Sequence, residues 1–173
     1  MLLDSLKTNL SKIIGTCFGV GYFPKAPGTI ATLVIALIWF LIPEYFFYNS
    51  IENEIFFDRY LYLFVVLLAI SWVSVRICSV CENFYGNDSS KIVIDEVVGY
   101  MFAVLFLPKT PMVALYAFIL FRMFDIWKPF GIRRLERFKN GYGVMLDDIA
   151  AGIGANIVLQ IIYIVKPSFF YFI

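Results

Sequence analysis

Acidic residues form two clusters beside long apolar runs of this sequence. The first is IVIDEVVGY, with Asp95 and Glu96, and the second is GVMLDDIAAG, with Asp147 and Asp148. Between them, FRMFDIWKPFGIRR adds Asp125 and several cations, namely Arg122, Lys128, Arg133 and Arg134. Carboxylates at a membrane boundary are costly to place without a metal ion, a proton or a cationic partner. These residue types therefore indicate chemistry that involves both a cation and an anion.

The carboxylates share one site only if the fold brings their three segments together. Asp95 and Glu96 are neighbours, about 100° apart on a helix, so they can approach one metal ion from two directions. Oxygen ligands suit Mg²⁺, and the interleaved cations suit phosphate. The alternative is that each acidic pair only stabilises a helix start through the helix dipole, and that Arg122 and Asp125 form an interfacial ion pair. Taken together, the segments favour a metal-dependent phosphate site.

A glycine- and proline-rich segment, GTCFGVGYFPKAPGTIATL, precedes an apolar run. Its glycines, Gly28 among them, allow close backbone approach. Thr29 is predicted to cap a helix that begins near Ile30, which leaves free amides for an anion, and Lys25 adds a positive charge. The alternative is an ordinary loop before a membrane helix.

Composition points to a membrane protein. The chain is 61% hydrophobic and 16% charged, whereas a soluble domain is about 45–50% apolar. Residues 26–43, 60–75 and 149–165 carry no charge, and each approaches the roughly 20 residues that cross a bilayer. We therefore predict an all-α fold, a polytopic helical bundle with three spanning helices. The whole chain, residues 1–173, forms one membrane-embedded domain.

Residues 97–121 are also apolar, but the sequence LPKTP interrupts them. Its prolines break a continuous helix. A single crossing would place Asp95 and Asp125 in opposite compartments, whereas a helical hairpin returns both to one face. The sequence therefore predicts a proline-broken hairpin.

Amphipathic and basic segments predict the orientation. Apolar residues at helical spacing within residues 1–13 indicate an interfacial N-terminal helix. Residues 132–138 form either a second interfacial helix or a basic loop. Because the charges of residues 44–59 are mostly acidic and residues 122–139 are rich in lysine and arginine, the positive-inside rule places the N-terminal segment and residues 122–139 in the cytoplasm.

Several mechanisms are excluded by residues that the sequence lacks. There is no histidine, which excludes a phosphohistidine intermediate and a Ser-His pair. No cysteine is followed by five residues and an arginine, so a cysteine-phosphatase loop is absent as well. Metal-activated water or, as the alternative, a carboxylate nucleophile remains. The net charge of +1 gives no argument for nucleic acid, and Cys78 and Cys81 form a lone CxxC that is better interpreted as buried apolar residues than as a zinc site.

Four motifs, in order over residues 15–156, resemble the phosphatidylglycerophosphatase A family of bacterial membrane enzymes. They are FGVGYFPKAPGT, KIVIDEVVGY, FRMFDIWKPFGI and GYGVMLDDIAAG. The resemblance implies Mg²⁺-dependent hydrolysis of phosphatidylglycerophosphate to phosphatidylglycerol and phosphate. It also implies a multi-pass protein of the bacterial inner membrane with its active site facing the cytoplasm. One departure is that Gly131 follows Phe130 where the family commonly has proline, which affects the rigidity of the turn.

The resemblance also implies residue roles. Asp95, Asp147 and Asp148 would bind Mg²⁺, and Glu96 or Asp125 would orient or deprotonate the attacking water. The phosphate would be bound by a set of polar and cationic residues, Lys25, Thr29, Arg122 and Lys128. The lipid substrate and the bilayer are the partners, and no protein partner is implied.

Two alternatives come from other classes of protein. A cation transporter would also hold carboxylates among helices, but near the bilayer midplane rather than at the ends of apolar runs. A non-catalytic membrane scaffold would explain Gly152 and Gly154 as packing sites, but it leaves the acidic motifs without a role.

Overall fold

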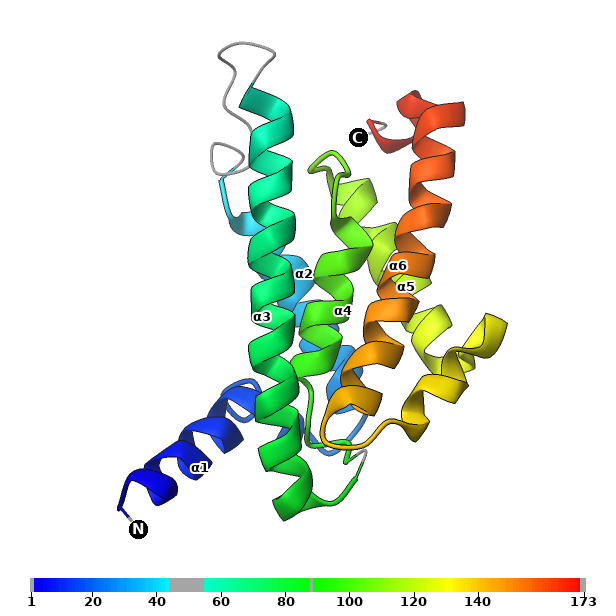
Figure 1. Ribbon diagram of the computed structural model, residues 1–173. Coiled ribbons are helices and arrows are strands. Elements are labelled where there is room, and N and C mark those ends of the chain that lie inside the picture. Colours follow the sequence, from blue (N-terminus) through cyan, green and yellow to red (C-terminus); the bar gives the residue numbers. More distant parts are fainter. Residues whose placement is uncertain (1, 44–54, 88, 172–173) are drawn as a thin grey trace.

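The fold is a bundle of helices, and the computed structural model describes residues 2–43, 55–87 and 89–171. Within these residues every regular element is a helix (Figure 1). The α-helices are α1 (Leu2–Gly15), α2 (Pro27–Leu41), α3 (Ile55–Tyr85), α4 (Ile94–Val104), α5 (Pro111–Trp127) and α6 (Tyr142–Val165). Short 3₁₀-helices are η1 (Val20–Tyr22), η3 (Pro129–Arg137) and η4 (Pro167–Phe170). The all-α prediction is confirmed.

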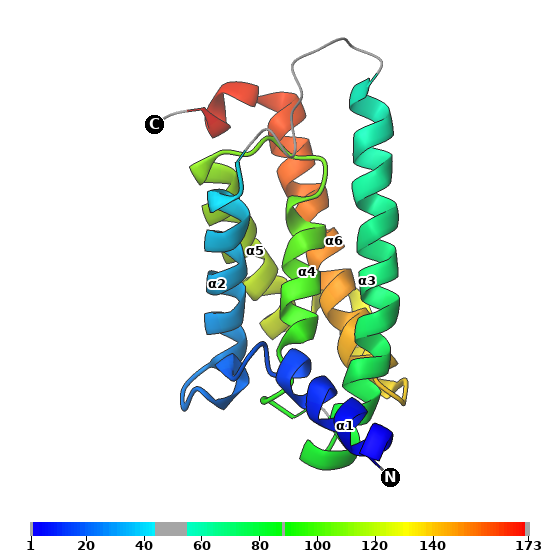
Figure 2. The same cartoon turned by 90° about the vertical axis from the view of Figure 1, so that its left-hand side faces the viewer.

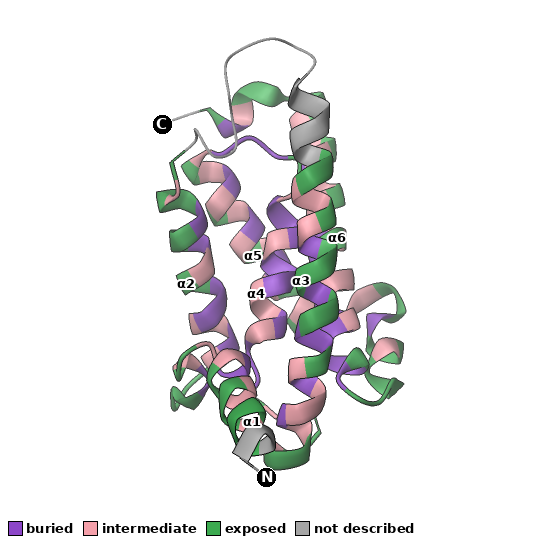
Figure 3. Cartoon of the chain, turned by 60° about the vertical axis from the view of Figure 1, so that its left-hand side comes forward, coloured by how far each residue is buried: buried purple, intermediate pink, exposed green. Residues whose placement is uncertain are grey.

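Two of the described helices are long and apolar enough to cross a membrane. They are Leu61–Tyr85 within α3 and Tyr142–Val165, which is α6. Helix α2 is apolar but has 15 residues, a length of roughly 22 Å against about 30 Å of hydrocarbon. The outward faces of these helices expose large apolar side chains (Figure 3). Of the predicted acidic connection at residues 44–59, residues 44–54 lie outside the described residues.

The chain breaks between α4 and α5 at LPKTP. Helix α5 begins at Pro111, and the hydroxyl of Thr110 caps it by accepting a backbone hydrogen bond at 3.2 Å. Proline is favourable there, because a helix's first amide has no helical partner. Helix α5 runs back alongside α4 (Figures 1 and 2), so that Arg122 Nη1 lies 3.9 Å from Glu96 Oε1 at the start of α4. The break therefore brings polar ends of these helices together.

Amide side chains of α6 satisfy the backbone at the broken end of α4. Asn156 Nδ2 donates to the carbonyl oxygens of Ala103 and Leu105 at 3.0 and 2.7 Å, and Gln160 Nε2 donates to that of Phe106 at 3.2 Å. The last carbonyls of a helix have no partner within it, and in apolar surroundings an unpaired carbonyl is unfavourable. Helix α6 therefore stabilises the interruption.

Helix α4 lies at the centre of the bundle (Figure 2), and its most extensive contact is with α6. Glycines permit this contact. A Cβ atom on Gly152 would lie 2.1 Å from the carbonyl oxygen of Gly99, and one on Gly99 would lie 2.8 Å from the carbonyl oxygen of Asp148. Backbones approach this closely only where side chains are absent. The contact places Asp148 of α6 against the first turns of α4.

Two helix ends differ from the sequence prediction. Helix α6 begins at Tyr142 rather than near residue 149, so Asp147 and Asp148 lie in its second turn and not before it. Helix α3 continues past Arg76 and ends before Gly86, which has a φ of 92°. The predicted ends followed the first charged residue, but a charge does not interrupt helical hydrogen bonds. Proline or a left-handed glycine does.

The start of α2 also differs. Pro27 occupies its first position and Ala26, at a φ of 50°, is the N-cap residue. The fixed φ of proline suits this position, so the helix starts before Thr29, and the prediction that Thr29 caps it is wrong. Thr29 lies within the first turn instead.

The basic segment after α5 folds as the 3₁₀-helix η3 rather than as a regular α-helix. Phe130 and Gly131 within it have φ values of 57° and 86°. Proline has a φ near −65° and could not adopt the conformation of Gly131. At position 131, where the family commonly has proline, the backbone of this chain has a positive φ that excludes proline and favours glycine.

The glycine contact between α4 and α6 can be tested by adding one methyl group. Gly152→Ala forces the two backbones apart, and overpacking of this kind costs roughly 1–3 kcal/mol. Gly154→Ala is a matched control, because a Cβ atom there meets only the Phe124 ring, at 3.5 Å. We expect thermal unfolding in detergent to show a lower Tm for Gly152→Ala alone. Equal Tm values for both variants would contradict the contact.

Candidate active site

Three carboxylates from two helices meet at one end of the bundle. Asp95 and Glu96 lie in the first turn of α4, and Asp148 lies in α6. One oxygen from each residue lies within 4.8 Å of the other two. Asp95 and Asp148 are buried, with 6% and 4% of their surface exposed. The close α4–α6 contact thus brings Asp148 to Asp95 and Glu96, whereas the sequence prediction grouped Asp95 with Asp147 and Asp148 as metal ligands.

Each of these carboxylates presents a buried oxygen without a hydrogen-bond partner. These atoms are Asp95 Oδ1, Glu96 Oε2 and Asp148 Oδ2. Buried charges without a partner are strongly unfavourable, and like charges at this spacing disfavour one another's ionisation. A divalent cation would satisfy all three oxygens, since carboxylates are the ligands that hard cations prefer. The donor set therefore fits a metal ion.

Arg122 places a cation directly beside this acidic cluster. Its Nη1 atom lies 2.7 Å from Asp125 Oδ2, an ion pair between successive turns of α5. The Nε atom of Arg122 is buried and has no hydrogen-bond partner. Buried donors are rarely left unpaired, so this N–H group is suited to an anion. Asp125 also lies within electrostatic reach of Asp148.

Asp147 points to different partners from those of its neighbour Asp148. Its carboxylate pairs with Lys128 Nζ, which also lies 2.8 Å from Glu136 Oε1. Burial alone would lower the pKa of Lys128, but its hydrogen bonds to Asp147 and Glu136 raise that pKa above the ordinary lysine value. The structure therefore brings Glu96, rather than Asp147, together with Asp95 and Asp148. Sequence reasoning missed Glu136, whose signal is a single acid within a basic segment.

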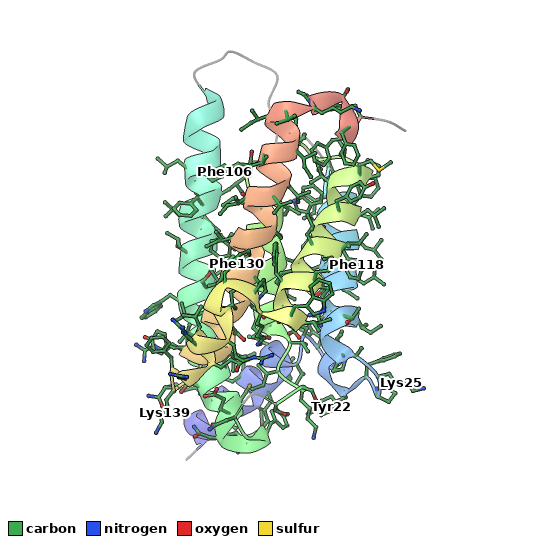
Figure 4. All side chains as sticks on the ribbon, turned by 90° about the vertical axis from the view of Figure 1, so that its right-hand side faces the viewer. Tyr22, Lys25, Phe106, Phe118, Phe130 and Lys139 are labelled. Carbon is green, nitrogen blue, oxygen red and sulfur yellow. The ribbon has the colours of Figure 1, made fainter. Side chains whose placement is uncertain are left out.

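The start of α2 touches the acidic cluster through Gly28. A Cβ atom on Gly28 would lie only 1.8 Å from Glu96 Oε1, so the absence of a side chain lets the carboxylate rest on this first turn. Thr29 is half-buried in the same turn. Lys25 is exposed in the preceding loop and points away from the bundle in Figure 4. The glycine-rich segment thus reaches the site through its backbone, and Lys25 is not brought to it.

A polar cavity of about 320 Å³ lies beside Asp147, between the end of α3, η3 and the start of α6. Its lining includes both acids and cations, among them Glu82, Arg137 and Lys139. Glu82 Oε2 accepts a hydrogen bond from the Gly141 amide at 2.8 Å, which fixes the chain before α6. The cavity is therefore polar, and it borders Asp147 rather than the three clustered carboxylates.

Comparison with known protein families accounts for this arrangement. The phosphatidylglycerophosphatase A family model matches residues 13–163. The chain belongs to the phosphatidylglycerophosphatase A family. The match spans all four sequence motifs and every carboxylate of the site. As a member of the phosphatidylglycerophosphatase A family, the chain is a phosphatase.

This chain aligns with most of the length of its curated relatives. A putative phosphatidylinositol-3-phosphatase of Bacteroides thetaiotaomicron is 36% identical over 160 residues, which cover 88% of this chain and 92% of the relative. Phosphatidylglycerophosphatase A of Escherichia coli is 33% identical, covering 82% of this chain and 76% of the relative. The protein of that name from Haemophilus influenzae is 30% identical, with 85% of each chain covered. No solved structure matches the chain.

The Lys128 ion pairs predict a stability effect. Lys128→Met removes the cation that pairs with the buried Asp147, and breaking a buried pair in this way costs about 3–5 kcal/mol. We expect a clearly lower Tm in detergent, partly restored in the double variant Lys128→Met/Asp147→Asn, because the charge of the former partner is then removed as well. Lys25→Met, at an exposed lysine, serves as the control and should leave Tm unchanged. An unaltered Tm for Lys128→Met would show that this pair contributes no stability.

Proposed function

We propose that this phosphatase hydrolyses the terminal phosphate of phosphatidylglycerophosphate, releasing phosphatidylglycerol and inorganic phosphate. The observation that carries the proposal is a cluster of three carboxylates, each with a buried oxygen that has no hydrogen-bond partner, which approach within 4.8 Å of one another. An arginine with an unpartnered N–H group lies beside them. A cation and a phosphate together satisfy these groups, and the relatives from Escherichia coli and Haemophilus influenzae carry the corresponding name.

Asp95, Glu96 and Asp148 are the proposed Mg²⁺ ligands. When bound, Mg²⁺ would lower the pKa of a water molecule and neutralise charge on the phosphate. This assignment replaces Asp147 with Glu96, since Asp147 pairs with Lys128. Asp147 then acts on the site by holding Lys128 and η3 against the start of α6. Its backbone neighbour Asp148 remains free to face α4.

Arg122 and Asp125 supply the remaining chemistry. Arg122 Nε would donate to a phosphate oxygen and stabilise the charge that develops on it, an effect typically worth about 3–4 kcal/mol. Asp125, which lies near Asp148, would take the proton of the attacking water at its carboxylate. The P–O bond to the glycerol then breaks, and the glycerol oxygen takes up a proton. The backbone amides at Gly28 and Thr29 are further candidate donors to the phosphate.

The proposed setting is the bacterial inner membrane, with the site at the cytoplasmic face. Helices α3 and α6 would cross it, and α2 and the α4–α5 pair would lie within it. Helix α1 and the basic η3 lie at the same end of the bundle as the start of α4 (Figure 1). Aromatic side chains in the segments that follow α1 and α5 are highly exposed, including Phe18 at 86% and Phe130 at 95%. Basic and aromatic residues at one end are typical of a cytoplasmic membrane interface.

Phosphatidylinositol 3-phosphate is a second candidate substrate. The observation in its favour is the 36% identity to the relative named a putative phosphatidylinositol-3-phosphatase. Both lipids carry a phosphomonoester on a polar headgroup, so the same carboxylates and Arg122 would serve either one. The two lipids differ in the rest of the headgroup, so phosphate release from each one decides between them.

The transporter and scaffold alternatives fit the geometry less well. The carboxylates lie in the first turn of α4 and the second turn of α6, whereas a transport site is expected near the middle of the spanning helices. A scaffold would gain nothing from three carboxylates with buried, unpartnered oxygens, because unsatisfied buried charges destabilise a fold.

Phosphate release by the purified protein tests the proposal. The panel consists of phosphatidylglycerophosphate, phosphatidylinositol 3-phosphate and phosphatidic acid, each with Mg²⁺ and with EDTA. We expect turnover with Mg²⁺ and its loss in EDTA. Asp95→Asn and Asp148→Asn should each lower kcat/KM at least about a hundredfold, since loss of a ligand weakens both metal affinity and transition-state stabilisation. Glu82→Gln, which keeps an acceptor for Gly141, is the control, and full activity in EDTA would exclude the metal mechanism.

The role of Arg122 is tested separately from metal binding. Arg122→Gln should lower kcat/KM about a hundredfold, the cost of removing one well-placed donor, while the Mg²⁺ concentration for half-maximal activity changes little. Lys25→Gln removes a cation that the structure places away from the carboxylates and should retain near-normal kcat/KM. The opposite ranking of the two variants would place the phosphate at the glycine-rich loop.

A further inference from the structure

An apolar groove runs along α4 on the side away from the acidic cluster. It consists of two adjoining cavities of about 290 and 230 Å³, which share Ile35 of α2 and Ile94 and Val97 of α4 in their linings. Helix α2 forms one wall and α3 the other (Figure 2). Every lining side chain is apolar except Lys109, in the turn after α4. The groove exists because α2 and α3 each pack on α4 and hardly touch one another.

The groove and the carboxylates lie on different faces of helix α4. Ile94, Val97 and Met101, spaced by three and four residues, line the groove and are half-buried. Asp95 and Gly99 are buried on the side that faces α6. Ile94, which lines the groove, directly precedes Asp95 of the acidic cluster, so the groove and the cluster meet at the start of α4. An occupant of the groove can place a polar group at the site while its apolar part lies between α2 and α3.

The length of the groove matches one leaflet of a bilayer. Helix α4 has 11 residues, a length of about 16 Å. Half of the hydrocarbon thickness is about 15 Å. The turn after α4, with Leu107 and Lys109, lines the far end of the groove. The depth of the groove therefore suits a chain that begins at the headgroup level and ends near the bilayer centre.

We propose that this groove binds one acyl chain of the phospholipid whose phosphate lies at the acidic cluster. The assignment rests on the proposed function and adds a binding site for the lipid tail. Apolar walls on three sides surround the chain, and because the chain comes from hydrocarbon rather than from water, its gain in the groove is one of packing contacts. The groove then selects a lipid phosphate over a water-soluble phosphomonoester and fixes the headgroup relative to Arg122.

Filling the groove tests the assignment through chain-length dependence. Ile35→Trp on α2 and Leu63→Trp on α3 each place a large ring in the groove from opposite walls. With long-chain phosphatidylglycerophosphate, kcat/KM should fall at least about tenfold, equivalent to about 1.4 kcal/mol of lost binding and positioning. With a dihexanoyl substrate it should change less than about twofold, which also shows that the variants fold. Ile157→Trp, on an outward face of α6 at 54% exposure, is the control and should leave both values near wild type.

Two kinetic outcomes would overturn the assignment: equal losses for both chain lengths, or no loss for the long-chain lipid. A binding experiment decides the same point without activity. Phosphatidylglycerol with a photoreactive diazirine in one acyl chain should label α2, α3 and α4 in the wild type, and Ile35→Trp but not Ile157→Trp should reduce this labelling. Labelling confined to the outer faces of α3 and α6 would overturn the proposal. A dimer in detergent that Ile35→Trp dissociates would also overturn it, because a second copy of the chain would then occupy the groove. Absence of phosphatase activity with groove labelling retained would instead reject the proposed function.

Discussion

The mutual repulsion of three clustered carboxylates, two of them buried, is the constraint on which this structure depends. Asp95, Glu96 and Asp148 converge within 4.8 Å, and burial makes their ionised forms costly unless a cation joins them. Packing in other parts of the bundle offsets the unfavourable free energy of holding these carboxylates together. The glycine contact between α4 and α6 and the capped break after α4 hold the backbones in place, so that the carboxylates cannot move apart to relieve their repulsion.

Adjacent residues on α6 have separate tasks because a helix turns by about 100° per residue. Asp148 faces α4 and the acidic cluster, whereas Asp147 faces Lys128 and Glu136. The cations divide in the same way. Lys128 is neutralised by two acids, while Arg122 keeps a buried N–H group without a partner. The site thus contains a structural ion pair and, beside it, groups that a metal ion and a phosphate would satisfy.

The sequence was sufficient to predict the helical fold, the break at LPKTP and the segments that carry the carboxylates. It was not sufficient to choose between Asp147 and Glu96 as members of the cluster. That choice depends on the rotation of α6 about its axis, which is set by the contact between Gly152 and Gly99 rather than by local pattern. The start of α6 was also predicted too late. A charged residue limits the part of a helix that can lie in hydrocarbon, but it does not end the helical hydrogen bonding. Glu136 pairs with Lys128 through the conformation of η3, in which Phe130 and Gly131 are left-handed.

The caps on α4 have a consequence for the order of assembly. Asn156 and Gln160 belong to α6, the last α-helix of the described chain, so a ribosome completes them only after α4 and α5 have emerged. Until then the carbonyl oxygen of Leu105 lacks the amides of Asn156 and Gln160, and an unpaired carbonyl costs about 1–3 kcal/mol when buried. The nascent α4–α5 pair therefore gains its buried turn only when α6 arrives. Assembly of the carboxylate cluster at one end of α4 and pairing of the turn at its other end thereby depend on the same late event, the docking of α6.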